Sequence, residues 1–404
     1  MYRRVFGAFI IFALIVLLIL SFFSCGGSGG SNSSKTVVIG ALLAKTGSLS
    51  SMGLSAGTAL NLAVGDVNAY LTQQNAGFTI ALQAVDTQTD PAVALVQARS
   101  LASSGIKVAV GPQSSGEAQS ILDWANSNGF IMISPPSTAP SLAIAGDNLF
   151  RMTPDDTHQA VAVTSKMESD KIQAIVPIWR DDIYGDELVS AAVSDFQYAG
   201  GLAMSGVKYD TSTTNFAPQV AALKTQVAAA VNKYGASRVA VYIVAFEEFI
   251  NIFQLAANDP VLSSVKWYGN DACAVNSTLL NNAAASGFAY SVNLACTSFE
   301  AGGTSSDAIS GRIAQVTGQT PDTYALAAYD ALWIIAKAYM KAGVWASTAD
   351  LKSAIVSVAD HYYGATGVTL LNDAGDLEYG LYTFWQLSKN TKGYTWTTTS
   401  GVVR

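Results

Sequence analysis

The sequence predicts an α/β fold made of two doubly wound lobes, each built on a parallel sheet. Short β-branched runs alternate with stretches of helical apolar spacing, as where residues 36–43 are followed by residues 55–73. The connections between these elements are short, which favours right-handed crossovers and parallel strands. The alternation begins again after Arg151, so we expect two such units in succession.

Each element is predicted from its apolar spacing and from the glycines and prolines that end it. In the first unit we expect strands at 36–43, 78–85, 108–110 and 130–134, and helices at 55–73, 91–104 and 115–128. In the second we expect strands at 173–178, 203–209, 239–244 and 265–269, and helices at 184–198, 216–233 and 247–257. Two helices follow at 323–342 and 349–359, and then a hairpin of 367–371 and 380–387 around a turn at 372–375.

The composition narrows the class of function. Half of the 404 residues are hydrophobic and 13% are charged, which excludes a disordered chain. The net charge of -7 argues against nucleic-acid binding, which requires a basic surface. His158 and His361 are the two histidines, too few for a zinc site with several histidine ligands. The sequence has no phosphate-binding loop and no Gly-x-Ser-x-Gly motif, so we expect neither a cofactor nor a metal, and we do not expect an enzyme.

The N-terminal residues are typical of an export segment. Arg3 and Arg4 precede an uncharged stretch, residues 5–24, which is either a signal peptide or an uncleaved membrane anchor. We expect residues 1–24 to be a signal peptide cleaved before Cys25, where Cys25 becomes lipidated, although Phe22 stands where a lipoprotein box usually has Leu. Residues 25–35 are rich in Gly and Ser and predict a flexible tether. Either alternative places the body outside the cytoplasm, held at a membrane.

Two further cysteines, Cys273 and Cys296, remain in the body of the chain. In an exported protein a remaining pair of this kind predicts a disulfide. The alternative is that both are buried free thiols.

Ligands of open parallel sheets bind beyond the carboxyl ends of the strands, so the residues that follow each strand are candidates for a site. Ser114 and Ser115 follow the strand at 108–110, and Thr138 follows the strand at 130–134. Both loops lead into helix starts, whose free N–H groups attract a carboxylate. The alternative for Ser114 is a capping box with Glu117.

Asp271 follows the predicted strand at 265–269 and is placed to meet an ammonium group. The alternative is a turn cap, because Asn270 and Asp271 are typical turn residues. Aromatic side chains follow two other strands of the second unit, with Tyr184 after one and Phe246 after the other. We expect these aromatics at the rim of the second unit, to stack on a ligand or to form a lid. The alternative is that they pack in the core.

Several motifs, taken in order, resemble one family. The chain resembles the type I periplasmic solute-binding proteins of ABC transporters, in particular the branched-chain amino acid (leucine/isoleucine/valine) receptor group, from Val37 to about Trp385. The motifs are Gly40-Ala41-Leu42, Thr46-Gly47-Ser48, Met52-Gly53, Gly111-Pro112-Gln113-Ser114-Ser115, Ile133 to Pro140, Phe150 to Asp155, Asp182-Ile183-Tyr184-Gly185 and Gly375-Asp376. Their shared order and spacing carry the resemblance, since no single motif is decisive.

The resemblance implies a role for each site residue. It implies that Ser115 and Thr138 hold a ligand carboxylate, and that Asp271 and the main-chain carbonyl of Pro136 hold its ammonium. It implies that Tyr184 closes over the ligand and that Tyr324 lies near the side-chain pocket. In three places this chain differs from the family: Met52 replaces a Tyr or Phe, Phe246 replaces a common Tyr, and Asp271 is one methylene shorter than the usual Glu.

The resemblance also implies the domain organisation and the function. Three crossovers near residues 155, 298 and 379 make one lobe from 36–154 plus 299–378 and the other from 155–298 plus 379–404. The expected function is that of a monomeric extracytoplasmic receptor, which captures an amino acid of branched-chain or similar type and delivers it to a membrane permease. The alternatives are a receptor for amides, urea or aromatic acids, a non-transport lipoprotein of the same fold acting as a sensor or an activator of peptidoglycan synthesis, and an extracytoplasmic hydrolase.

Overall fold

A computed structural model describes residues 35–391 and 393–403 of the chain. The expected signal peptide, Cys25 and all but the end of the Gly/Ser tether lie outside these residues. Thr36–Arg404 form one compact unit. Within the described residues, no helix combines the length and the apolar character that crossing a membrane requires.

The first sheet is parallel and has the strand order β2-β1-β3-β4-β5. Its strands are β1 (Lys35–Leu43), β2 (Phe78–Asp86), β3 (Val108–Val110), β4 (Ile131–Ser134) and β5 (Leu149–Arg151). Helices α2 (Ser50–Gln73), α3 (Pro91–Ser103) and α4 (Ser115–Asn128) connect them. Every residue of β3 and β4 is buried, as expected for strands that are covered on both faces.

The second sheet has the order β13-β12-β11-β10-β9-β6-β7, with β8 also paired to β6. Its strands are β6 (Ala174–Arg180), β7 (Leu202–Ala203), β8 (Val207–Tyr209), β9 (Val239–Val244), β10 (Lys266–Gly269), β11 (Ala295–Phe299), β12 (Tyr382–Asn390) and β13 (Gly393–Val403). Its helices are α5 (Asp156–Ser169), α6 (Ile183–Tyr198), α7 (Ala217–Tyr234), α8 (Phe249–Ala256), α9 (Ser277–Leu280) and α10 (Ala283–Ser291). Strands β6 to β11 are parallel, whereas β12 and β13 are antiparallel to their neighbours.

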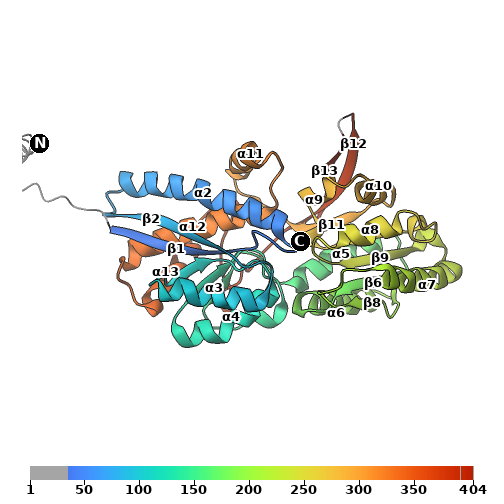
Figure 1. The fold of residues 1–404 in the computed structure, drawn as a ribbon, viewed down its shortest axis with the longest axis horizontal. Coiled ribbons are helices and arrows are strands. Elements are labelled where there is room, and N and C mark those ends of the chain that lie inside the picture. Colours follow the sequence, from blue (N-terminus) through green and yellow to red (C-terminus); the bar gives the residue numbers. More distant parts are fainter. Residues whose placement is uncertain (1–34, 392, 404) are drawn as a thin grey trace, which may run out of the picture. The chain divides into compact units, whose positions relative to one another are not determined.

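The chain passes between the two sheets more than once. After β11 it forms α11 (Ser306–Thr317), α12 (Thr323–Ala342) and α13 (Thr348–Ala359), and residues of all three helices join the hydrophobic core of the first sheet. It then returns to the second sheet as β12. We call the first sheet with its helices the first lobe and the second sheet with its helices the second lobe (Figure 1).

Four short 3₁₀ turns complete the described elements: η1 (Pro140–Leu142), η2 (Ala236–Arg238), η3 (Leu262–Ser264) and η4 (Asp271–Cys273).

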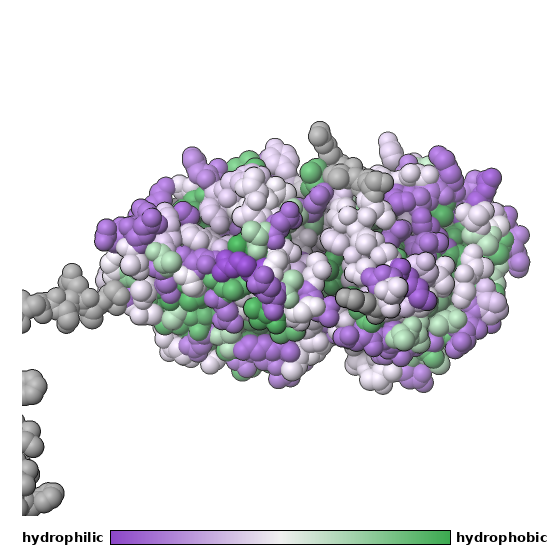
Figure 2. All heavy atoms as spheres, turned by 90° about the horizontal axis from the view of Figure 1, so that it is seen from above, coloured by the Kyte–Doolittle hydropathy of each residue, from purple (hydrophilic) through white to green (hydrophobic). Residues whose placement is uncertain are grey.

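On the face seen in Figure 2, hydrophobic residues form small patches among hydrophilic ones. Single exposed hydrophobic residues of this kind are normal for a protein surface in water.

The α/β fold with two parallel sheets is confirmed, but two details of the prediction are wrong. The terminal hairpin is formed by β12 and β13, whereas residues 367–371 make only isolated bridges, Tyr363 with Val368 and Leu371 with Leu377. The strand expected at 203–209 is broken at Gly206, which has a φ of 72°. A Cβ atom there would meet Pro177 at 2.6 Å, so this position of the break requires glycine.

The predicted disulfide is also absent from the structure. Cys273 and Cys296 are both buried free thiols. The Cys273 thiol donates a hydrogen bond to Asn270 Oδ1 over 2.8 Å, and both cysteines pack in the core of the second lobe. Burial raises the pKa of the Cys273 thiol well above its usual range, which disfavours the thiolate that oxidation requires.

Candidate functional site

A cavity lies where the strand ends and helix starts of the two lobes face each other. Its volume is about 10 Å³, which is about the space of one water molecule. Its lining residues are Leu49, Met52, Gln113, Ser114, Ser115, Pro136, Tyr184, Phe246, Asp271, Ala272 and Tyr324. Eight of these residues were predicted from the sequence as ligand-binding, namely all of them except Leu49, Gln113 and Ala272.

The first lobe contributes the N-terminus of α4. Ser114 is its N-cap: Glu117 N donates to Ser114 Oγ over 3.3 Å, and Ser114 Oγ donates to Glu117 Oε2 over 3.0 Å. This is the capping box that the sequence offered as the alternative role of Ser114. Ser115 Oγ accepts hydrogen bonds from Thr138 N and Ala139 N, each 3.1 Å long. Two accepted bonds leave the Ser115 hydroxyl proton to be donated to a ligand.

Thr138 does not line the cavity, although the sequence predicted it beside Ser115. It is fully buried, and its hydroxyl donates to Asp156 Oδ2 over 2.9 Å. Its backbone N–H is the group that reaches Ser115. The structure therefore places Thr138 behind the wall of the cavity, where it fixes Ser115 from one side and Asp156 from the other.

The second lobe contributes Asp271, which begins η4 directly beyond β10. Tyr184 donates its hydroxyl to Asp271 Oδ1, and Tyr324 donates its hydroxyl to Asp271 Oδ2. Asn270 Nδ2 supports this arrangement by donating to the Tyr184 hydroxyl oxygen over 2.6 Å. Tyr324 starts α12, which packs with the first lobe, so the Asp271 carboxylate is held by side chains from both lobes.

A second buried carboxyl group stands behind Asp271. Asp156, the first residue of α5, accepts from Gln159 Nε2 over 2.7 Å, and Gln159 Oε1 accepts from Asp271 N over 3.0 Å. Burial raises the pKa of Asp271, and burial together with the charge of Asp271 raises the pKa of Asp156 well above its ordinary value. The pair therefore favours holding a proton while no cation is near.

Aromatic rings close the second-lobe side of the cavity. The rings of Tyr184 and Phe246 are stacked, with centroids 5.4 Å apart. The Arg180 guanidinium carbon lies 3.5 Å from the centroid of Phe246, and Arg180 forms ion pairs with Asp182 and Glu248. Phe246 is thus fixed between two partners without the hydroxyl that the resemblance associates with its position.

Glu247 joins the two lobes at the edge of the site. Helix α2 has no side-chain cap from its own N-cap residue, but Ser51 N in its first turn donates to Glu247 Oε1 over 2.7 Å. Ser50 Oγ donates to Glu247 Oε2 over 3.2 Å, and Glu247 N donates to Ser48 O over 2.9 Å. Glu247 thus caps a helix of the opposite lobe, and these contacts hold the lobes closed over the cavity.

The lining residues favour binding over catalysis. They include a helix N-terminus and a serine hydroxyl, which attract an anion, and one carboxylate, which attracts a cation. Both histidines lie outside this lining, and the Ser114 hydroxyl donates to the buried Glu117 carboxyl group in the capping box rather than to a histidine. His158 is instead half-exposed on α5 and pairs with Asp155 over 3.5 Å.

Sequence comparison supports a receptor family. The family model described as "Receptor family ligand binding region" matches residues 55–390. An uncharacterised protein of Methanocaldococcus jannaschii is 27% identical over 310 residues, covering 75% of this chain and 72% of that protein. The Leu/Ile/Val/Thr-binding protein of Salmonella typhimurium is 30% identical over 197 residues, covering 48% of this chain and 52% of that protein. The chain thus spans about half the length of this second relative.

Solved structures share the fold at low sequence identity. A leucine-binding protein, LivK, from Thermotoga maritima superimposes with a TM-score of 0.73 at 16% identity, covering 91% of this chain and 98% of that one. A solute-binding protein of an ABC transporter from R. palustris, solved with benzoate, gives 0.71 at 17% identity, covering 90% and 96%. These two likenesses show the fold that the resemblance implied, that of type I periplasmic binding proteins.

Proposed function

Because the chain belongs to the family of receptor ligand-binding regions, we propose that it is an extracytoplasmic solute-binding receptor of an ABC transporter. Its ligand is a small α-amino acid of about the size of the branched-chain amino acids. The proposal includes lipid attachment at Cys25, a monomeric state and delivery of the ligand to a membrane permease. The observation that carries it is the placement of the Asp271 carboxylate and the N-terminus of α4 on the walls of one small cavity.

A zwitterion fits this arrangement because each of its charges finds an opposite partner. The Ser115 hydroxyl and the N–H groups of α4 would receive the carboxylate, and Asp271 would receive the ammonium. Both partners are needed, since an unpaired charge in a buried site is expensive. A plain carboxylate such as benzoate would leave Asp271 without a cation, which argues against that ligand class here.

Binding is expected to favour the closed arrangement of the lobes. A ligand that contacts both lobes at once binds the closed form more tightly, and this difference in affinity shifts the population toward closure. The closed form is then the one that a permease would recognise. Tyr184 belongs to the second lobe and Tyr324 to a helix of the first, and both donate their hydroxyls to Asp271. A ligand that pairs with Asp271 would therefore affect both lobes.

The first test is a thermal-shift screen of the full chain against the twenty amino acids, short amides, urea and benzoate. A ligand at about 100 times its Kd stabilises the folded state by about 2.7 kcal/mol, which such a screen detects. We expect shifts with small α-amino acids and none with benzoate. A shift with benzoate alone would contradict the pairing with Asp271, and no shift with any compound would favour a non-transport protein of the same fold.

Affinity for an amino acid is expected to rise with pH above about pH 4, the ordinary pKa of an aspartate, until the pH passes the raised pKa of Asp271. The raised pKa of Asp271 means that a proton competes with the ligand ammonium, so binding releases protons. In the empty protein the sign is opposite: protonation of Asp156 and Asp271 stabilises the fold at low pH, and this contribution is lost as pH rises through their raised pKa values.

Calorimetric titration in buffers of different ionisation enthalpy measures this proton release directly. The limiting slope for one proton is about tenfold in Kd per pH unit. An affinity that is constant over this pH range, with no proton release, would show that the ligand does not pair with Asp271.

Replacing Glu247 is expected to weaken ligand binding, although Glu247 itself does not line the cavity. The Glu247→Ala variant loses the cap that α2 receives from the second lobe, and a lost N-cap costs about 0.5–2 kcal/mol. This corresponds to a roughly 2- to 30-fold increase in Kd, expressed mainly in the dissociation rate. Stopped-flow kinetics measures that rate, and Glu168→Ala, on the exposed face of α5, is the matched control. Equal dissociation rates in the two variants would rule out a role for Glu247 in closure.

A further inference from the structure

Gln113 is a lining residue of the cavity with a donor that no group of the described protein satisfies. It lies three residues beyond the end of β3 and is almost fully buried, with 2% of its surface exposed. Its Oε1 accepts a hydrogen bond from Ala44 N over 2.7 Å, which fixes the orientation of the amide. Its Nε2 is buried and has no hydrogen-bond partner within the described residues. A buried donor of this kind is costly, so its survival in a cavity wall points to a ligand that satisfies it.

Neighbouring side chains do not account for this donor. Thr87 Oγ1 and Glu117 Oε1 likewise make no hydrogen bond of good geometry within the described part of the chain, but neither residue lines the cavity. The two are close to each other, since the Thr87 hydroxyl lowers the pKa of Glu117, which burial raises more strongly. Glu117 Oε2 accepts hydrogen bonds from Gln113 N and Ser114 Oγ.

We propose that Gln113 selects an α-amino acid whose side chain carries a neutral oxygen acceptor, a hydroxyl or an amide, over an apolar side chain of the same shape. This inference rests on the proposed function and narrows the ligand class. Gln113 lies on the first-lobe wall with Leu49 and Met52, whereas the second-lobe wall presents Asp271. Asp271 is assigned to the ligand ammonium, and Ser115 with the N-terminus of α4 is assigned to the ligand carboxylate, so Gln113 remains for the ligand side chain.

The charges around Gln113 exclude an acidic side chain. Among the described residues no lysine or arginine lines the cavity, and the Glu117 carboxyl group accepts a hydrogen bond from the backbone N–H of Gln113 itself. A ligand carboxylate at this point would be buried next to another acid without a counter-ion. A hydroxyl or amide oxygen accepts from Nε2 without that penalty, and Leu49 and Met52 contact the apolar part of the same side chain.

The test compares pairs of amino acids that differ in polarity but hardly in shape: Thr with Val, Asn with Leu, and Gln with Met. Calorimetric Kd values for the full chain should favour the oxygen-bearing member of the best-fitting pair by roughly ten- to a hundredfold, because the apolar member leaves Nε2 unsatisfied. Equal or tighter binding of the apolar members would overturn the inference while leaving the proposed function intact. Failure of every amino acid to bind would overturn the proposed function itself.

Two variants assign the preference to Gln113. Gln113→Met removes the donor at nearly the same volume, so the ratio of Kd values within a pair should fall toward one. Gln226→Met is the control, because the Gln226 amide bridges Gly206 N and Gly206 O and does not line the cavity. An unchanged ratio in a folded Gln113→Met would overturn the assignment. If this variant does not fold without the bond to Ala44, the wild-type ratios decide the matter.

Discussion

Replacing Asp271 by asparagine is expected to abolish amino-acid binding at ordinary concentrations while leaving the empty protein at least as stable. The carboxylate is 5% exposed and accepts the hydroxyls of Tyr184 and Tyr324, so it is held in place before any ligand arrives. Removing one partner of a buried charge pair costs roughly 2–5 kcal/mol, or about 30- to 5,000-fold in Kd. The loss is expected for every α-amino acid, since all of them share the ammonium group.

The opposite effects on binding and on stability separate this result from misfolding. Burial raises the pKa of Asp271, which means that ionising this carboxyl group in the empty site costs folding free energy. An asparagine of the same shape carries no charge, so the melting temperature of the empty protein should be unchanged or higher. Thermal shift measures both effects, and Asp123→Asn on the exposed face of α4 is the control. Normal ligand-induced shifts in Asp271→Asn would contradict the ammonium role of Asp271.

Much of the fold could be predicted because the information is local. The buried strands β3, β4 and β9 and the helices α4 and α12 lie within about two residues of their predicted bounds. The terminal hairpin shows where local information ends. Its expected turn exists, with Asn372 Oδ1 accepting from Ala374 N and Asp376 N. The strand β12 beyond it pairs instead with β11 and β13, and the sequence around a turn does not identify such partners.

The candidate site could be predicted to a similar extent and for a similar reason. The rule that ligands bind beyond the carboxyl ends of parallel strands pointed to Ser114, Ser115 and Asp271, which lie together on the cavity wall. Hydrogen-bond partners are set by the tertiary structure, so the engagement of Thr138 with Asp156 was not foreseen. Gln113 could have been found by its position next to Ser114 after β3. Nothing in the sequence indicates that, within the described residues, its Oε1 has a hydrogen-bond partner while its Nε2 has none.

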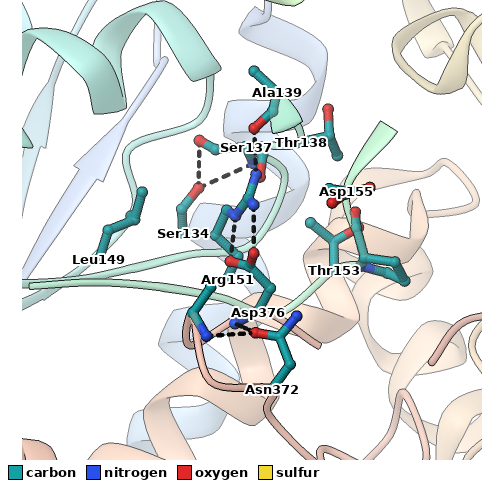
Figure 3. Close-up of polar contacts among 12 residues, drawn as sticks. Ser134, Ser137, Thr138, Ala139, Leu149, Arg151, Thr153, Asp155, Asn372 and Asp376 are labelled. Carbon is teal, nitrogen blue, oxygen red and sulfur yellow. Dashed lines mark hydrogen bonds and ion pairs between the residues drawn. The ribbon is translucent and has the colours of Figure 1, made fainter. Parts of the chain in front are cut away.

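Arg151 and Asp376 belong to two separate motifs of the family resemblance, and in the structure they form an ion pair. Arg151, at the end of β5, donates from Nε and Nη2 to the two carboxylate oxygens of Asp376, each over 2.5 Å (Figure 3). The two residues are separated by 225 positions in the chain, and both are almost completely buried. Arg151 Nη1 also donates to Ala139 O over 2.8 Å and to Ser137 O over 3.2 Å. One side chain therefore fixes β5, the loop after β4, and the segment that leads back toward β12.

Replacing Arg151 by methionine is expected to lower the free energy of unfolding by about 3–5 kcal/mol, because it leaves the Asp376 carboxylate buried without a partner. The exposed pair of Arg312 and Asp66, with 40% and 31% of the side chains accessible, provides the control. Arg312→Met should cost no more than about 1 kcal/mol. Urea denaturation of both variants measures the difference, and equal midpoints would contradict a structural role for the buried pair.

A double variant separates the loss of the pair from the exposure of an unpaired charge. Arg151→Met combined with Asp376→Leu should recover much of the stability, since replacing a buried ion pair by apolar residues is often neutral or stabilising. Ligand affinity should not recover with it. The loop that Arg151 Nη1 holds through Ser137 and Ala139 carries Pro136 into the cavity wall, and methionine cannot donate to those carbonyls. Recovery of both properties would mean that the loop keeps its position without Arg151.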